Sequence, residues 1–430
     1  MLFNTYKFLQ KIIIIFQYLV FPLLYILRPF FSFLSKRADF EAKNRFNPSF
    51  KSIGKRADYC FHVSSEGELE QCLILIDDFL AKGKLVELVY TSPSVERKCR
   101  LLDETHQNLR SFRMPLLSFP FYSFRRWVSA KTLFMCRYDF FSEIMLYGAR
   151  EDVSFYLLSA TLKGKDNLGA VTKHFALGKF NLFDGIFCAS LKDVERFKTL
   201  GVEGALEEYE FRLLQIHNRV SNSEGKLNEV QLIRPFIELL KSRGPQKNII
   251  LGSAWPNEML VFKNAEFIEK IKSGEILVCI APHTLGEAAI AEIVSSIEEI
   301  TKDVGIHLIG DTELPSSPCI YINPTPGVLL ESFKYFSHCF IGGGHGRSIH
   351  SVLEPYLAGG IVYTGPRIHR STEFDFIETH SSDCVVVVNE LETFYHLLTS
   401  YDREKELTKR ARIVDTYKLR FLSLMDEFKC

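Results

Sequence analysis

A glycine-rich stretch from Phe340 to Pro366 carries the clearest pattern for chemistry in the chain. It reads FIGGGHGRSIHSVLEPYLAGGIVYTGP and contains seven of the 25 glycines. The pattern predicts a buried strand, a GGGHG turn whose backbone amides can approach a ligand, and a helix from Ser348 to Leu357. Free amides and the positive dipole end at a helix start bind phosphate. The stretch therefore predicts a phosphate site, to which Arg347 adds a positive charge.

Two side chains in the expected helix could recognise the sugar groups attached to the phosphate. His350 and Glu354 are four residues apart, so they share one helical face. A carboxylate can accept both hydroxyls of a ribose, and a histidine can bind a phosphate or a sugar carboxylate. Glycine-rich turns with a solvated His and Glu behind them are also common in α/β proteins, so this second interpretation stays open.

A second candidate for chemistry is HVSSEGELE, residues 62–70. Glu68 lies where an expected strand ends and a helix begins, and a carboxylate at that position can take a proton from an acceptor hydroxyl. It can equally be an acid that the helix dipole stabilises in the first turn. Glu66 and Glu70 compete for the catalytic role, and the residue types alone do not choose among the three.

Two further strand exits carry candidate ligand contacts. GSAWPNE (252–258) places Trp255 after the apolar run NIIL, and IAPHT (280–284) places His283 after another apolar run. Ligands of α/β proteins bind at such strand ends. A Trp packed into the core and a structural His remain alternatives. No paired-carboxylate metal signature is present, so we expect neither a metal nor a cofactor.

The elements that must position these residues alternate between short apolar runs and helical patterns, which is typical of parallel sheets covered by helices. The length of 430 residues favours two domains. A polar stretch at 218–228, NRVSNSEGKLN, reads as a linker. We predict two doubly wound Rossmann-like domains facing across a cleft, one over 41–220 and one over 221–430. Packing of the last helix back on the first domain is left open.

Residues 1–40 are predicted to be a membrane anchor. Ile12 to Ile26 is apolar except for Gln17, and basic residues flank it, while the first acidic residue is Asp39. Pro22 interrupts the run, and a spanning helix needs roughly 20 apolar residues. An in-plane anchor, a true span and a signal sequence are therefore all considered. In the first two, the flanking bases favour anionic lipid on the cytoplasmic side.

Composition excludes some partners. The chain has 52 basic and 52 acidic residues, so a nucleic acid bound through a globally basic surface is not expected. Its ten cysteines form no CxxC pair, which favours buried reduced thiols in a cytosolic body. The segment RSFRMPLLSFPFYSFRRW (110–127), with Arg125 and Arg126 near its end, mixes arginines with aromatic residues. This mixture suits anionic lipid headgroups, and a partly buried connector is its ordinary alternative.

The order of these motifs resembles the 3-deoxy-D-manno-octulosonic acid (Kdo) transferase family. The resemblance runs from the apolar N-terminus through HVSSEGE, TSPSV (91–95), FPFYSFRRW, RYDFF (137–141), GSAWPNE and IAPH to the glycine-rich stretch, which is its most specific part. It implies the glycosyltransferase B fold, with an acceptor-binding N-terminal domain and a donor-binding C-terminal domain. It also implies an inverting, metal-independent transfer of Kdo from CMP-Kdo to a lipid A precursor in lipopolysaccharide biosynthesis, at the cytoplasmic face of the inner membrane.

The resemblance assigns roles residue by residue. It implies that Glu68, preceded by Gly67, is the catalytic base, and that Asp139 stands where the family has a cleft glutamate. Arg125 and Arg126 belong to the acceptor side. The implied donor-side residues are Ser253, Trp255, His283, Gly343, Gly344, Arg347, Ser348, His350 and Glu354.

Two departures from the family pattern bear on the activity. Phe141 replaces a tryptophan, and Glu207 and Glu208 stand where the family has a basic residue. The reversed charge removes an expected cation near an anionic donor or lipid phosphate. Two alternative functions follow, namely a membrane glycosyltransferase that uses another nucleotide sugar, and a catalytically silent paralogue that binds lipid or a partner.

Overall fold

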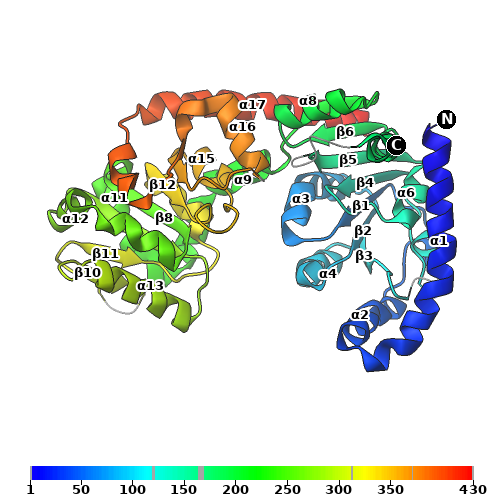
Figure 1. Cartoon of the computed structure of the whole chain (residues 1–430), viewed down its shortest axis with the longest axis horizontal. Helices are drawn as coiled ribbons and strands as arrows, with labels where there is room; N and C mark the ends of the chain where they lie inside the picture. The colour runs from blue at the N-terminus through cyan, green and yellow to red at the C-terminus, as the bar shows by residue number, and fades with distance from the viewer. Residues whose placement is uncertain (1, 119–121, 163–168, 311–312, 370, 429–430) are drawn as a thin grey trace. The chain divides into compact units, whose positions relative to one another are not determined.

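A computed structural model describes residues 2–118, 122–162, 169–310, 313–369 and 371–428 (Figure 1). The chain forms two compact units. Unit 1 comprises Met1–Arg212 together with Phe421–Cys430, and unit 2 comprises Leu213–Arg420. Nine cysteines within the described ranges are buried and form no disulfide.

Unit 1 is built on a seven-stranded parallel sheet in the order β3-β2-β1-β4-β5-β6-β7. Its strands are β1 (Tyr59–Val63), β2 (Val86–Tyr90), β3 (Leu109–Arg113), β4 (Thr132–Cys136), β5 (Ser154–Ala160), β6 (Gly185–Cys188) and β7 (Ala205–Glu208). Its helices are α1 (Leu2–Leu27), α2 (Ser32–Ala42), α3 (Glu66–Ala81), α4 (Glu96–Thr105), α5 (Phe124–Trp127), α6 (Ser142–Gly148), α7 (Ala170–Phe180) and α8 (Leu191–Leu200).

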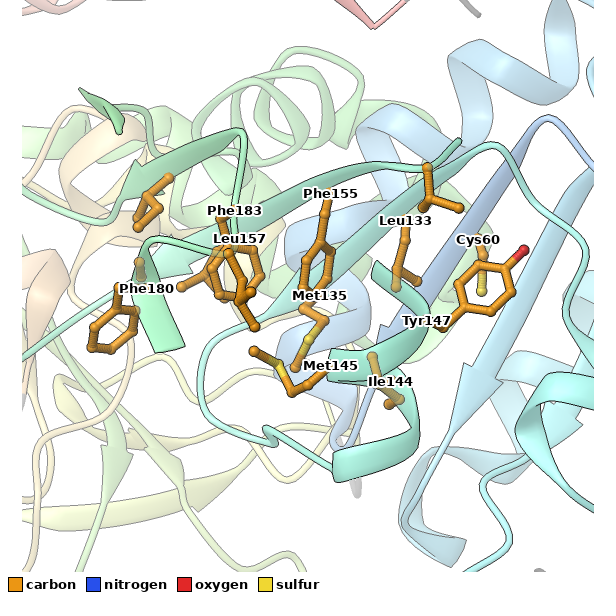
Figure 2. Packing of buried hydrophobic residues seen from close by; sticks show 14 of the residues in the cluster. Cys60, Leu133, Met135, Ile144, Met145, Tyr147, Phe155, Leu157, Phe180 and Phe183 are labelled. Carbon is orange, nitrogen blue, oxygen red and sulfur yellow. The ribbon is translucent and has the colours of Figure 1, made fainter. Parts of the chain in front are cut away.

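The core of unit 1 lies between this sheet and its covering helices. β1, β2 and β4 are buried along their whole length, as expected for strands with helices on both faces. Figure 2 shows part of this core, where Met135 and Leu157 from neighbouring strands pack with Met145 of α6 and Phe183. Burial of such aromatic and aliphatic side chains is the main favourable contribution to folding.

Unit 2 repeats the architecture, with a parallel sheet in the order β10-β11-β9-β8-β12-β13-β14. Its strands are β8 (Asn248–Ala254), β9 (Leu277–Pro282), β10 (Gly305–Leu308), β11 (Cys319–Ile322), β12 (His338–Ile341), β13 (Ile361–Thr364) and β14 (Val385–Val387). The helices from here on are α9 (Arg212–Ser221), α10 (Ser223–Glu229), α11 (Arg234–Arg243), α12 (Ala265–Lys272), α13 (Glu287–Ile300), α14 (Leu329–Ser332), α15 (Leu353–Leu357), α16 (Thr372–Ser381) and α17 (Arg403–Glu427).

The predicted fold class, two doubly wound α/β domains, is confirmed. In each sheet the strand order reverses at one point, between β1 and β4 in unit 1 and between β8 and β12 in unit 2. Loops that leave the carboxyl ends of the two strands at such a point diverge to opposite faces and leave a crevice for a ligand. Each unit therefore has one position in its sheet where a site is expected.

The linker predicted at 218–228 is wrong. The segment is helical, because α9 and α10 run through it. Its polar residues mislead because they cover one side of these helices, while Leu213, Leu214, Ile216 and Leu227 are buried. The division between the compact units falls at Arg212, the first residue of α9.

The two ends of the chain both belong to unit 1. The last residues of α17 and Phe428 pack back on the first sheet, where the Phe428 ring contacts Phe134, Tyr156 and Phe187. The Tyr59 hydroxyl donates to the Phe428 carbonyl at 3.0 Å. At the other end, α1 lies against α6, as Figure 1 shows, and it also contacts α7.

Candidate active site

The predicted catalytic base, Glu68, lies beside the point where the sheet of unit 1 reverses. Glu68 is in the first turn of α3, directly after β1, and the Ser65 hydroxyl caps this helix by accepting the Glu68 amide at 3.2 Å. The Glu68 side chain turns back, and its Oε2 accepts the Ser64 amide at 2.6 Å. The residue is only 8 % exposed. A carboxylate that folds back on its own loop is thus held in one orientation.

The surroundings of Glu68 tune it for proton transfer near neutral pH. Burial raises its pKa to about 7, and the negative charge of Asp139 adds to the rise, while the Ser64 amide and Arg137 oppose it. A general base is most effective when its pKa lies near the working pH. Titratable groups perturbed in this way are concentrated at functional sites.

The structure distinguishes Glu68 from its two neighbours. The Lys98 ammonium lies 2.8 Å from a Glu66 carboxylate oxygen and 3.3 Å from one of Glu70. Both of these carboxylates are thus ion-paired, and both are more exposed than Glu68. This geometry favours Glu68 as the proton acceptor, which the residue types alone could not decide.

Asp139 approaches Glu68 from the other strand at the reversal point. It follows β4, and the Ser64 hydroxyl donates to its Oδ2. Burial raises the pKa of Asp139. Because Ser64 contacts Asp139 through its hydroxyl and Glu68 through its amide, the two acids are fixed relative to each other. Phe141, the departure from the family pattern, packs edge-on against the ring of His62 at 5.6 Å.

The other residues predicted for the acceptor side lie in open positions. Gly67 has no atom within 4 Å of where a Cβ would stand, so its surface is free for a ligand to approach. Arg125 and Arg126 are exposed on α5, whereas Trp127 of the same helix is buried against Phe112. Residues 119–121, the start of the segment FPFYSFRRW to which both arginines belong, lie outside the described residues.

Glu208 is one of the two acids that stand where the family has a basic residue, and it stabilises the fold of unit 1. Its Oε1 accepts the Leu191 amide at the start of α8 at 3.0 Å. An acid at a helix N-terminus satisfies a backbone donor and complements the helix dipole. The loss of a basic residue here is therefore accompanied by a structural use of the acid.

In unit 2, rings from three adjacent strand exits form a cluster, which we call the ring cluster. Trp255 follows β8, His283 follows β9, and His350 follows β12. The His283 ring centroid lies 4.3 Å from that of Trp255 and 4.2 Å from that of His350. The Trp255 Nε1–H group donates to His350 Nε2 at 3.4 Å. The sequence-predicted contacts of three separate motifs therefore come together.

The ring cluster is uncharged but stands beside a cation. The Arg347 guanidinium lies over the Trp255 ring at 3.9 Å, a cation–π contact. Burial, His283 and Arg347 lower the pKa of His350 to about 4, and burial and Arg347 lower the pKa of His283. An anion placed against Arg347 and the two imidazoles would be attracted by the guanidinium and would favour protonation of the histidines. The arrangement suits a phosphate or carboxylate ligand.

Most glycines of the GGGHG turn are packed closely against the protein's own backbone. A Cβ at Gly343 would stand 2.3 Å from the Ser348 carbonyl oxygen, and one at Gly344 would stand 2.6 Å from the Gly365 Cα. These glycines make room for the protein's own backbone. Gly346, at the exposed tip of the turn, is the one glycine of the motif with no atom within 4 Å of where a Cβ would stand.

The predicted helix start at Ser348 is also wrong. α15 begins only at Leu353, so His350 and Glu354 do not share a helical face. The Val352 and Leu353 amides, at the start of α15, donate to the Glu373 carboxylate at 2.9 and 3.2 Å. An internal acid thus takes the place that the sequence suggested for a phosphate.

The other predicted donor-side residues lie around the same turn. Ser348 is exposed, and Glu354 is half-buried in α15. Ser253 has a positive φ of 52°, a conformation that is rare for residues other than glycine. Its carbonyl oxygen would lie 2.1 Å from a Cβ at Gly342. The strained Ser253 backbone therefore fits closely against the glycine-rich turn.

Sequence reasoning missed Glu258 as a functional candidate. Its carboxylate is buried and accepts the Trp255 and Gly343 amides, both at 2.8 Å. The signal was present, because an acid three residues after the N-cap of a helical turn often reaches back to the cap amide. Within the described ranges, no group of three or more His, Cys, Asp or Glu side chains is arranged to hold a metal ion.

Comparison with known proteins supports the resemblance stated from the motifs. Residues 36–208 match the sequence profile of the family described as 3-deoxy-D-manno-octulosonic-acid transferase (kdotransferase). This range includes the loop of Glu68 and Asp139 but not the ring cluster. A sequence comparison with curated proteins finds no match.

Solved structures resemble the chain in fold. UDP-GlcNAc 2-epimerase from Neisseria meningitidis has a TM-score of 0.55 at 10 % identity, covering 86 % of this chain and 100 % of its own. A glycosyltransferase from Rickettsia africae has a TM-score of 0.51 at 10 % identity, covering 87 % and 99 %. The C-terminal CMP-Kdo binding domain of WaaA from Acinetobacter baumannii matches with a TM-score of 0.33 at 13 % identity, covering 47 % and 98 %. The first two establish the glycosyltransferase B type of fold.

Proposed function

We propose that the protein transfers Kdo from CMP-Kdo to a lipid A precursor at a membrane surface, with Glu68 as the general base. The observation that carries this proposal is a buried carboxylate with a pKa of about 7, at the sheet reversal point of the region that matches the Kdo transferase family. The glycosyltransferase B fold of both units supports a transferase.

The proposed chemistry is a single displacement with inversion. The Glu68 carboxylate takes the proton of the acceptor hydroxyl, whose oxygen forms a bond to the anomeric carbon of Kdo as the bond from that carbon to the CMP phosphate breaks. CMP leaves with the electron pair and gains negative charge. We assign the stabilisation of this negative charge to Arg347, His283 and His350. The Gly343 and Val352 amides of the glycine-rich stretch are already bonded to carboxylates of the protein.

The direct test uses the purified full chain with CMP-Kdo and a tetra-acylated lipid A precursor. Formation of the Kdo-bearing lipid supports the proposal. CMP binding without any product would instead favour the silent paralogue. If CMP does not bind and another nucleotide does, the enzyme uses a different nucleotide sugar.

The pH dependence of transfer offers a test of the two acids. We expect kcat/KM to rise with pH through about 7, because only the ionised Glu68 accepts a proton. In Asp139→Asn the side-chain oxygen still accepts the Ser64 hydroxyl but the charge is lost, so the pKa of Glu68 falls and the midpoint shifts to lower pH. Asp184→Asn, at a carboxylate that accepts the Phe155 amide, is the control and should keep the midpoint. An unchanged midpoint in Asp139→Asn would contradict this coupling.

α1 supports the membrane part of the proposal. Thr5–Phe30 is long and apolar enough to cross a membrane, with a mean hydropathy of 1.9. However, one face of α1 packs against unit 1. Tyr6 is buried there, and the Lys7 ammonium donates to the Ala149 carbonyl at 2.7 Å. The opposite face exposes large apolar side chains, namely Phe8, Ile12, Ile15, Phe16, Leu19, Leu23 and Ile26. A helix with one face on its domain and an apolar face outside suits in-plane insertion.

Acidic substitutions on this outer face should release the protein from membranes. We expect Leu19→Glu with Ile26→Glu to weaken binding to anionic lipid vesicles by at least about tenfold, because each side chain contributes roughly 1.5 to 3 kcal/mol on burial. Both residues are at least 70 % exposed, so the fold should tolerate the change. Vesicle co-sedimentation measures the effect, with Leu232→Glu, at an exposed leucine of unit 2, as the control. Equal sedimentation of all three proteins would exclude α1 as the membrane contact.

A further inference from the structure

Glu258 is a buried acid of unit 2 that contacts two of the three segments carrying the ring cluster, those after β8 and β12. It is 1 % exposed and lies in the helical turn Pro256–Lys263 that follows β8. Its Oε2 accepts the Trp255 amide at 2.8 Å, and its own amide donates to the Trp255 carbonyl at 3.0 Å. Its Oε1 accepts the Gly343 amide at 2.8 Å. One carboxylate thus joins the loop after β8 to the loop after β12.

The geometry of this contact suits a carboxylate. Two amides from separate segments bond to different oxygens of one side chain, and a carboxylate presents an acceptor to each. A glutamine would present its NH₂ group to one of the amides. Among the described residues no Lys or Arg forms an ion pair with Glu258, and burial raises its pKa to about 7 against the effect of the two amides. A buried carboxylate without a cation is costly, so a purely space-filling role would suit an apolar side chain better.

The two loops that Glu258 joins carry the rings. Trp255 is held directly at its backbone. On the other side, Gly342 and Gly343 fit against the acid, with a Cβ at Gly342 only 2.7 Å from Glu258 Oε2, and the His350 amide donates to the Gly342 carbonyl at 3.2 Å. The backbone segments that carry Trp255 and His350 are therefore both held in place through one carboxylate.

We propose that Glu258 is a positioning residue whose carboxylate fixes the Trp255 and Gly343 backbones and thereby keeps Trp255, His283 and His350 stacked as an anion-binding face. As a role in donor binding, this inference rests on the proposed function. The stacking itself does not, because it can be measured without any ligand.

The test uses Trp255 as a reporter in the full chain. The chain has two tryptophans, so Trp127→Phe leaves Trp255 alone. Lowering the pH from about 8 to about 6 protonates Glu258, loosens its hold on the two amides and should change the Trp255 emission. The other groups at the cluster are Arg347, over the Trp255 ring, and His283 and His350, whose pKa values are lowered. We expect Glu258→Gln to abolish the transition and to weaken CMP binding by about tenfold or more.

Glu87→Gln provides the matched control. Glu87 is also fully buried, accepts two backbone amides, those of Ser129 and Ala130, and has a pKa raised to about 7, but it belongs to unit 1. The control should lose comparable stability and keep both the Trp255 transition and CMP binding. A transition that persists in Glu258→Gln, or that both variants lose, would overturn the proposal. If Glu258→Gln does not fold, Glu258→Asp decides, since a retained carboxylate should retain the transition. Wild-type protein that shows the transition but binds no CMP refutes only the proposed function.

Discussion

Glu68→Gln is expected to lower the rate of Kdo transfer by about 10²- to 10⁴-fold while CMP affinity stays unchanged. Gln keeps an oxygen that can accept the Ser64 amide, so the orientation of the side chain is retained and only the proton-accepting charge is lost. The variant should fold well, because the pKa of Glu68 is about 7 and the native protein already holds its neutral form in part at neutral pH. Single-turnover rates and calorimetric titration with CMP measure the two quantities.

The neighbouring acids supply the controls for this experiment. Glu66→Gln and Glu70→Gln each remove one partner of Lys98 on a partly exposed surface, which costs little stability. Both variants should transfer Kdo within about threefold of the native rate, since an exposed ion pair contributes roughly 0 to 1 kcal/mol. If Glu68→Gln keeps the native rate and either neighbour loses it, the base assignment is wrong.

The sequence was informative where local pattern determines structure. Continuous apolar runs such as YCFHV and TLFMC became the buried strands β1 and β4, because a strand with helices on both faces needs apolar side chains in both directions. The positions of Glu68 and Asp139 directly after these strands placed them at the sheet reversal point once the strand order was known. Proximity of the two acids therefore follows from topology, which single-sequence patterns did not specify.

Local sequence patterns led to wrong or incomplete predictions where a residue distant in the chain bonds to the segment in question. Nothing between Ser348 and Leu357 reveals that Glu373 accepts the amides at the start of α15. Similarly, the choice among Glu66, Glu68 and Glu70 depends on Lys98 of α4, some thirty residues along the chain. The polar stretch at 218–228 misled for a related reason, since a helix with one buried face can carry a mainly polar sequence.

Gly344→Ala tests whether the glycine-rich turn leaves room for a phosphate or for the protein's own backbone. Gly344 has a φ of +69°, and a Cβ there would lie 2.6 to 2.8 Å from three backbone atoms of Gly365. The left-handed conformation costs an alanine about 1 to 2 kcal/mol, and overpacking against backbone adds about 1 to 3 kcal/mol. We therefore expect unit 2 to lose about 2 to 5 kcal/mol of stability. Denaturant unfolding followed through Trp255, in the Trp127→Phe background, measures it.

The stability of the variant, rather than its affinity, decides between the explanations. If the glycine left room for a phosphate, the alanine would fold with native stability and only CMP binding would fall. If it makes room for the Gly365 backbone, stability falls with or without ligand. Gly286→Ala, at an open position of unit 2 with no atom within 4 Å and an ordinary φ, should change stability by less than about 1 kcal/mol. Because the surrounding atoms of Gly344 are main chain and cannot rotate away, the second outcome is expected, and anion binding then falls to Arg347 and the ring cluster that this turn supports.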